Sequence, residues 1–345
     1  METVEHLIVG AGPAGLRAGQ VLADAGRKAL VVEKRAEIGP KTCAGGLTPK
    51  TVAILRGLGL PESAGLAHVG QVAFAPGHPV TLDPDGTTVV TLSRKELGRY
   101  QAAWTRAAGA EIRAGCPVRE LDLAGKTALV GGSGMGWRHL IGADGSDSAV
   151  RRALRLPSPR GYFAAEYNLE GVRLEPLRVE CDHRLGGGYF WVFPHDDYTS
   201  VGAVASKHVV RPATLRAYLD ARLERMRLAG HGEPLEGATL EVDFRGLHFA
   251  GGVHLAGDAA GVPSALTAEG IYSALLTGEE VARGILDPAH PSWRVTRWLR
   301  VKRWHDRFAA LLRRSSARAV ALPVLDRLSG WPLARRPMAD WFLAG

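Results

Sequence analysis

The chain has 345 residues, 46% of them hydrophobic and 23% charged, a balance typical of a soluble globular protein with a sizeable core. No run of about 18 uncharged apolar residues occurs, which excludes a transmembrane helix, and no basic-then-apolar leader follows Met1, so we expect no secretory signal. Three scattered cysteines (Cys43, Cys116 and Cys181) show neither zinc spacing nor a disulfide framework, so we expect a reducing, cytoplasmic setting and no metal site.

The positive charge is concentrated at the C-terminus. The chain carries 43 Lys+Arg and 35 Asp+Glu, a net charge of +8, and residues 291–345 hold 12 of the basic residues with only 3 aspartates. The rest of the chain is therefore nearly neutral, at −1. Because no recognised nucleic-acid-binding module accompanies this charge, we expect no nucleic acid among the partners.

The first predicted elements form a strand–helix–strand unit. Residues 5–10 are a short apolar run that ends in glycine, residues 13–25 are Ala-rich and compatible with a helix, and residues 28–33 form a second apolar run. Short apolar runs of this kind are typical of strands that are buried on both faces. We therefore expect two parallel strands joined by a right-handed helical crossover.

The turn between the first strand and the helix has the spacing of a dinucleotide-binding fingerprint. Residues 10–15 read Gly-Ala-Gly-Pro-Ala-Gly. In this pattern Gly10 permits a tight turn, Gly12 lets the backbone approach a pyrophosphate, and Gly15 lets the helix pack closely on the strand. The phosphate then lies at the helix N-terminus, and Glu33, at the end of the second strand, can accept hydrogen bonds from ribose hydroxyls.

The middle of the chain has a different texture. Residues 68–92 and 160–207 contain short β-rich runs broken by Gly, Pro and Asp, which favour antiparallel strands. Residues 251–258 return to the buried-strand pattern, and a helix is predicted from about 269 to 285. We therefore predict an α/β chain, α+β overall: a Rossmann-like domain with an inserted antiparallel β-rich substrate domain and a helical C-terminal segment. The predicted boundaries are 1–67, 93–157 and 248–290 for the Rossmann-like domain, 68–92 and 158–247 for the substrate domain, and 291–345 for the basic segment.

Two further strand ends place aspartate beside glycine. Asp144-Gly145 follows the short apolar run 139–141, and Gly257-Asp258 follows the run near 255. An aspartate at such a strand end can bind a sugar or ribityl hydroxyl while the glycine lets the backbone come close. Each pair alone is a common turn, but the three motifs in this order are specific.

The order of these three motifs resembles the FAD-dependent oxidoreductases of the p-hydroxybenzoate hydroxylase type and, within them, the geranylgeranyl reductase family. The resemblance spans roughly residues 4–285. Four stretches carry the closer match: Lys-Thr-Cys-Ala-Gly-Gly-Leu at 41–47, Gly-Tyr-Phe-Trp-Val-Phe-Pro at 188–194, Asp-Ala-Ala-Gly at 258–261 and Glu-Gly-Ile at 269–271. The chain departs from the family pattern at Ala44, which replaces a glycine, at Ala265, which replaces a proline, and at His195, where a lysine is common.

The resemblance implies FAD as cofactor and the reduction of C=C double bonds of a prenyl or other lipid chain by hydride from reduced flavin. NAD(P)H or another reductant would be the electron donor, bound transiently, because only one complete dinucleotide fingerprint is present. The substrate would be a small, apolar molecule. The FAD-binding residues that the motifs and the resemblance imply are Gly10, Gly12, Pro13, Ala14, Gly15, Glu33, Lys34, Ala44, Gly45, Arg94, Val118, Asp144, Gly257, Asp258, Gly270 and Ile271.

Two other enzyme functions stay open at this point, a flavin monooxygenase and, less favoured, a flavin-dependent halogenase. A flavin monooxygenase acting on a small aromatic compound shares the same motifs, because the sequence does not show whether reduced flavin meets oxygen. The aromatic stretch also resembles flavin-dependent halogenases, but the lysine that they need is absent between Lys50 and Lys95. A non-catalytic flavin-binding protein is disfavoured by the complete set of motifs.

The candidate catalytic residues are Cys43, Tyr189 and Trp191. Cys43 lies in the glycine-rich loop that would line the flavin pocket. The alternative is that Cys43 is only a small, buried hydrophobic residue of the core. Tyr189, Trp191 and Phe193 alternate, so they would share one face of a strand and form an aromatic wall. The proton donor stays open between water, Cys43 and Tyr189. For His195 we favour a surface turn residue over a titratable group beside this wall.

The C-terminal segment combines arginine with tryptophan. It holds five of the eight tryptophans, including Trp341, and its basic residues interleave with apolar ones. The residues predicted to share one apolar helical face are Trp298, Val301, Trp304, Phe308, Leu311 and Leu312. Two interpretations remain: a basic amphipathic helix that contacts a membrane surface peripherally, or a helix that covers the substrate domain with solvated arginines.

Overall fold

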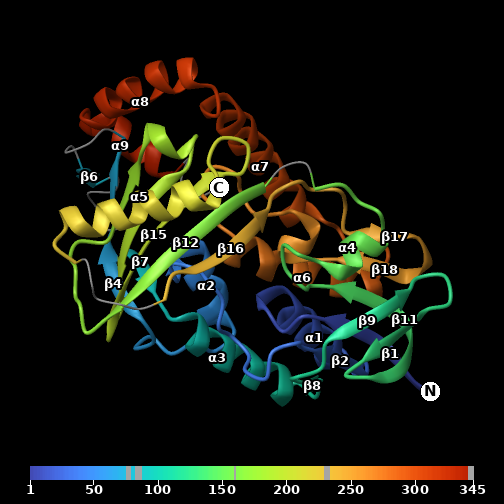
Figure 1. Ribbon diagram of the computed structural model, residues 1–345. Helices are drawn as coiled ribbons and strands as arrows, with labels where there is room; N and C mark the ends of the chain where they lie inside the picture. The colour runs from blue at the N-terminus through green and yellow to red at the C-terminus, as the bar shows by residue number, and fades with distance from the viewer. Residues whose placement is uncertain (75–78, 82–87, 159–160, 229–233, 341–345) are drawn as a thin grey trace.

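The computed structural model describes residues 1–74, 79–81, 88–158, 161–228 and 234–340. Within these residues the strands form three sheets, and Figure 1 shows the two large ones as separate bodies, with the C-terminal helices along the top. The predicted α/β class with a parallel sheet, an antiparallel sheet and C-terminal helices is confirmed.

The first sheet contains the predicted strand–helix–strand unit. Its strands are β1 (Glu2–Val9), β2 (Ala29–Val32), β8 (Glu111–Arg113), β9 (Val118–Asp122), β10 (Thr127–Val130), β11 (Ser133–Gly142), β17 (His248–Phe249) and β18 (Val253–Leu255). β1 pairs in parallel with both β2 and β11, and β11 pairs in parallel with β18. Helix α1 (Pro13–Asp24) connects β1 to β2, as the apolar spacing predicts. Strands distant in sequence thus bring their carboxyl ends to one edge.

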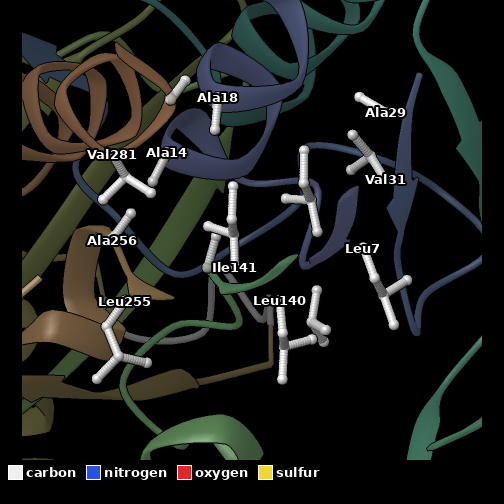
Figure 2. Close-up of a cluster of buried hydrophobic side chains, with 14 of the residues drawn as sticks. Leu7, Ala14, Ala18, Ala29, Val31, Leu140, Ile141, Leu255, Ala256 and Val281 are labelled. Atoms are coloured by element: carbon white, nitrogen blue, oxygen red, sulfur yellow. The ribbon is translucent and has the colours of Figure 1, made fainter. Parts of the chain in front are cut away.

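Small side chains let two helices pack tightly on this sheet. Figure 2 shows Ala14 and Ala18 of α1 and Val281 of α6 (Ile271–Leu286) gathered over Ile141, on one side of the strands. The two helices approach closely, because a Cβ atom on Gly278 of α6 would lie 2.2 Å from the Ala14 carbonyl oxygen. This packing fixes the N-termini of both helices relative to the carboxyl edge of the sheet. Helices α3 (Arg94–Ala107) and α4 (Ala149–Ala153) complete this half.

The second sheet is largely antiparallel. Its strands are β5 (Gln71–Ala73), β6 (Pro79–Thr81), β12 (Gly161–Glu170), β13 (Arg178–Cys181), β14 (Tyr189–Pro194), β15 (Tyr198–Ser206) and β16 (Glu236–Glu241). One pair departs from the expectation, since β5 and β13 run parallel. Helix α5 (Pro212–Arg225) covers one face, where Phe190 and Val192 are buried with Leu219. The alternate residues of β14 therefore point to the opposite face.

A small third sheet joins the two bodies. It consists of β3 (Gly46–Leu47), β4 (Leu66–Val69) and β7 (Thr88–Thr91), with α2 (Pro49–Gly57) directly after β3. Buried Thr91 of β7 donates its hydroxyl proton to the Pro194 carbonyl oxygen at 2.6 Å, which ties this sheet to the end of β14.

The C-terminal segment forms three helices, α7 (Trp293–Leu312), α8 (Ser315–Ser329) and α9 (Pro332–Ala339). The predicted apolar face of α7 is only partly right: Trp298 and Leu312 are buried, but Trp304 is 60% exposed and Leu311 44%. Lys302, which the prediction left out, is only 2% exposed. The true buried stripe is Val295, Trp298, Lys302, His305, Ala309 and Leu312. Hydrophobicity alone misplaces it because two of its positions are polar. Trp341 lies outside the described residues.

Candidate functional site

A large cavity opens where the carboxyl edge of the first sheet meets the second sheet. Its volume is about 310 Å³, and it extends from the start of α1 to the C-terminal helices. The residues predicted from the sequence that line it are Pro13, Cys43, Ala44, Arg94, Tyr189, Trp191, Asp258, Gly270 and Ile271. The other predicted residues lie outside this wall: Gly10, Gly12, Ala14, Gly15, Glu33, Lys34, Gly45, Val118, Asp144 and Gly257.

The glycine-rich turn forms a cradle at the N-terminus of α1. Gly10 has φ of +104°, and a Cβ atom there would lie 2.4 Å from the Ala143 carbonyl oxygen. A Cβ on Gly15 would lie 1.9 Å from the Gly10 oxygen, so both positions require glycine for the packing of the chain itself. A Cβ on Gly12, in contrast, meets no heavy atom within 4 Å. The open space beside Gly12, next to the positive end of the helix, fits a phosphate group.

The carboxylate of Glu33 lies beside this cradle. Its Oε2 accepts a hydrogen bond from the Ala11 N–H at 2.9 Å, and its Oε1 accepts one from the Arg35 N–H at 3.0 Å. The side chain is therefore held at the end of β2, where a ribose next to the phosphate would lie. Lys34 follows as an exposed residue, and Val118 begins strand β9, which pairs with β10.

The two aspartates at strand ends differ in their surroundings. Asp144 accepts hydrogen bonds from the Ser148 hydroxyl and the Ala149 N–H, both at 2.6 Å, and burial raises its pKa. Its carboxylate thus caps α4. Asp258 lines the cavity, where it pairs with the Lys41 ammonium at 2.7 Å and accepts a hydrogen bond from Ser146. Asp258 is the one placed to accept hydroxyl groups of a ligand in the cavity.

Two further features of the cavity wall favour a ligand ring that accepts hydrogen bonds and carries negative charge. Arg94, the first residue of α3, is only 9% exposed, and its buried Nε–H has no hydrogen-bond partner among the residues that the structure describes. An unpartnered buried donor is costly unless a ligand acceptor meets it. The N-terminus of α6 also faces the cavity at Gly270 and Ile271, and its dipole favours negative charge there.

The segment 43–45 is held from the second sheet by two side chains. Glu166 of β12 accepts a hydrogen bond from the Cys43 N–H at 2.6 Å, and His195 donates its Nε2–H to the Ala44 carbonyl oxygen at 3.0 Å. The favoured interpretation of His195 as a surface turn residue is wrong. Its side chain is 4% exposed and stacks on Tyr198, and burial lowers its pKa.

The alternating aromatic residues of β14 line the cavity on one face, as the spacing predicts. Tyr189 donates its hydroxyl proton to the Thr267 carbonyl oxygen at 2.8 Å, and burial raises the pKa of this phenol. Trp191 donates its indole N–H to the Ser200 hydroxyl at 2.9 Å. Phe193 packs against the backbone at Gly46. The wall is therefore apolar, and the hydrogen bonds of Tyr189 and Trp191 hold these two side chains in place.

Glu166 is the residue that the sequence analysis missed. It is 1% exposed, and burial raises the pKa of its carboxyl group to about 7, although hydrogen bonds from Ser200 and Cys43 oppose the shift. The one signal in the sequence is a glutamate directly after the largely apolar run 161–165 in a predicted β-rich segment. Buried carboxyl groups with such shifts are more common at functional sites than elsewhere.

The site therefore offers a phosphate cradle, a ribose-facing carboxylate, an aspartate in the cavity wall, an unpartnered arginine N–H and an apolar wall. This combination fits FAD, with the pyrophosphate at Gly12, the adenosine ribose at Glu33 and the flavin end in the cavity. The individual contacts to FAD stay predictions.

Comparison with known proteins supports this assignment. A model of the FAD binding domain matches residues 3–229. Digeranylgeranylglycerophospholipid reductase 1 of Methanopyrus kandleri is 28% identical over 93% of this chain and 91% of its own length. Menaquinone reductase of Mycobacterium tuberculosis is 29% identical over 83% of this chain and 77% of its own length.

Among solved structures, a geranylgeranyl bacteriochlorophyll reductase-like protein from Thermoplasma acidophilum superimposes with a TM-score of 0.79. The match covers 99% of this chain and 96% of that one at 21% identity, so it shows a shared fold. A digeranylgeranylglycerophospholipid reductase of Methanospirillum hungatei is 31% identical over 79% of this chain and 73% of its own length. The chain is an FAD-dependent oxidoreductase that belongs to the FAD binding domain family and to the geranylgeranyl reductase group.

Proposed function

We propose that this enzyme reduces C=C double bonds in the prenyl chain of a lipid. The observation that carries the proposal is the apolar extension of the cavity beyond the aromatic wall. The side chains that line this extension are Val72, Phe74, Leu177, Leu312, Leu322 and Leu325. Such a channel suits a long, flexible hydrocarbon better than a compact aromatic compound. The relatives named as reductases of digeranylgeranylglycerophospholipid and menaquinone support the same reading.

When bound, reduced FAD supplies the hydride for this reaction, and the protein positions the alkene. The apolar side chains exclude water from the reacting carbons, and Tyr189 and Trp191 limit how the chain can lie. A phenol is protonated at neutral pH, and burial raises the pKa of Tyr189 further, so this residue carries a proton that it could donate but holds it tightly. Cys43 lines the same cavity and remains the alternative donor. We propose an external reductant such as NAD(P)H, which binds transiently.

The test uses the purified FAD-loaded protein with dithionite, under anaerobic conditions, and a geranylgeranyl phospholipid in detergent micelles. We expect mass spectrometry to show products heavier by successive pairs of hydrogen atoms, the mark of double-bond reduction. Aerobic incubation with NADPH and the same lipid is the parallel arm. Products that gain an oxygen atom there, with no hydrogen gain in the anaerobic arm, would establish a monooxygenase instead.

We also propose that the C-terminal helices contact an anionic membrane surface peripherally. None of the helices in the described residues is long and apolar enough to span a membrane. Along the outer side of α7, Arg300, Trp304, Arg307 and Leu311 are exposed at helical spacing. On α8, exposed Val320, Val324 and Leu328 follow the same spacing. Alternating basic and apolar side chains of this kind are typical of interfacial helices.

The double variant Arg300→Gln/Arg307→Gln should bind phosphatidylglycerol vesicles about 30-fold more weakly than the wild type at low salt. The estimate assumes roughly 1 kcal/mol for each basic residue near an anionic surface. Vesicle co-sedimentation measures the partition coefficient. The control Arg56→Gln/Arg119→Gln removes the same charge from exposed positions outside the C-terminal helices. Equal weakening by both pairs would mean that only net charge matters and would rule out this docking face.

A further inference from the structure

We propose that Glu166 is a positioning residue that holds the Cys43 peptide and, through Ser200, the Trp191 ring in one arrangement. The inference rests on the proposed function, because it concerns two side chains that line the reacting cavity. Glu166 itself is outside the cavity wall, so it acts through the residues that it binds.

Each carboxylate oxygen of Glu166 has one defined partner. Oε1 accepts a hydrogen bond from the Cys43 N–H at 2.6 Å, and Oε2 accepts one from the Ser200 hydroxyl at 2.8 Å. The Ser200 oxygen in turn accepts the indole N–H of Trp191 at 2.9 Å. One buried carboxylate therefore connects a loop of the FAD-binding half with the aromatic wall of the second sheet.

The sheet register makes this connection compact. Glu166 of β12, Gly202 of β15 and Trp191 of β14 are direct cross-strand neighbours. A Cβ atom on Gly202 would lie 2.3 Å from the Trp191 ring, so the indole lies flat across β15 toward β12. The ring can reach Ser200 only because the residue beneath it has no side chain. Glycine at 202 and serine at 200 thus form part of the same arrangement.

The ionisation of Glu166 should alter this arrangement near neutral pH. Burial raises its pKa to about 7. The charged groups that act on its pKa are Arg94, which lowers it, and Glu236, which raises it. Tyr198 lies close enough to interact with both Glu166 and the Cys43 thiol. Above its pKa the carboxylate accepts both hydrogen bonds. Below it, the protonated oxygen must donate to Ser200, and the charge-assisted bond to the Cys43 N–H weakens.

The rate at which a thiol reagent labels Cys43 reports this change and does not require the enzyme to convert any substrate. The purified FAD-loaded protein is given short pulses of N-ethylmaleimide between pH 6 and 8.5. Mass spectrometry then compares the labelling of Cys43 with that of Cys116, a free cysteine in the same chain. We expect the ratio of the two rates to rise roughly fivefold as the pH falls through about 7, because the Cys43 segment loses a charge-assisted hydrogen bond.

The variant Glu166→Gln separates ionisation from structure. Its amide oxygen can still accept from the Cys43 N–H, and its amide nitrogen can donate to Ser200, so it mimics the protonated glutamic acid. In this variant the labelling ratio should be high and independent of pH. A wild-type ratio that stays constant across this range, or a Glu166→Gln ratio that keeps the step, overturns the proposal.

The second half of the connection is tested with Ser200→Ala against Thr199→Ala. Both hydroxyls are fully buried on β15, but Thr199 bonds to the Val172 carbonyl oxygen on the other face. Ser200→Ala should keep a pH step at Cys43 but move it to higher pH, because the Ser200 hydrogen bond lowers the pKa of Glu166. It should also lower kcat for prenyl reduction at least fivefold with little change in FAD content, whereas Thr199→Ala should keep kcat. If both variants lost kcat equally, Ser200 would have only a structural role, and its connection to Trp191 would not matter for the reaction. If the wild type reduces no prenyl lipid, the proposed function fails while the labelling experiment still decides the role of Glu166.

Discussion

Replacing Gly12 with Leu should yield a folded protein that no longer binds FAD. Gly12 has φ of −80°, which any residue adopts, and a Cβ atom there meets no heavy atom within 4 Å. The leucine side chain would instead occupy the space in which the pyrophosphate meets the N-terminus of α1. The loss of two charged hydrogen bonds to phosphate, at about 1.5 kcal/mol each, weakens FAD binding at least about 100-fold. Absorbance near the flavin bands and circular dichroism measure the two properties separately.

The matched control is Gly15→Leu, which changes another glycine of the same turn motif. A Cβ atom at position 15 would lie 1.9 Å from the Gly10 oxygen, so the turn and helix α1 cannot keep their positions. This variant should lose cooperative unfolding as well as colour. If Gly12→Leu retained stoichiometric FAD, the pyrophosphate could not lie at this turn, and the assignment of the cradle would be wrong.

The parts of the site that depend on local sequence could be predicted. The glycine turn, α1 and Glu33 lie within one strand–helix–strand unit, where spacing and strand burial determine their geometry. The alternation of Tyr189 and Trp191 likewise follows from the period of a strand, once β14 is recognised.

The parts that depend on distant partners could not. Glu166 meets the Cys43 peptide across 123 residues, and His195 meets Ala44 across 151 residues, so no local pattern reveals either contact. His195 follows a strand and precedes two aspartates, which is the pattern of an exposed turn. It is buried because the loop 43–45 packs over it, an effect of tertiary structure alone.

The same reasoning explains why the predicted apolar face of α7 is only partly right. Lys302 donates to the Val242 carbonyl oxygen and pairs with Asp306, and His305 is hydrogen-bonded to Ser264, so two polar side chains are satisfied inside the protein. Asp306 also accepts the Ala265 N–H at 3.1 Å. The segment 262–265, which leads into the N-terminus of α6, is therefore held by a helix outside the recognised family motifs.

Replacing Trp298 with Ala should consequently damage both stability and flavin binding. Its side chain is 1% exposed, its indole N–H bonds to the Val262 carbonyl oxygen at 3.0 Å, and its ring packs edge-on against Tyr272 of α6. Removal of a buried tryptophan costs about 3–5 kcal/mol of unfolding free energy. We also expect weaker FAD binding, because the loop that carries Gly270 loses its support. Urea unfolding followed by circular dichroism and by flavin release measures both effects.

The control is Trp304→Ala on the same helix. Because Trp304 is 60% exposed, its removal should change the unfolding free energy by no more than about 0.5 kcal/mol and leave the flavin in place. The pair therefore separates an inner face of α7 that supports the cofactor site from the outer face for which we propose contact with a membrane. Equal stability of the two variants would show that α7 only covers the protein and does not support the site.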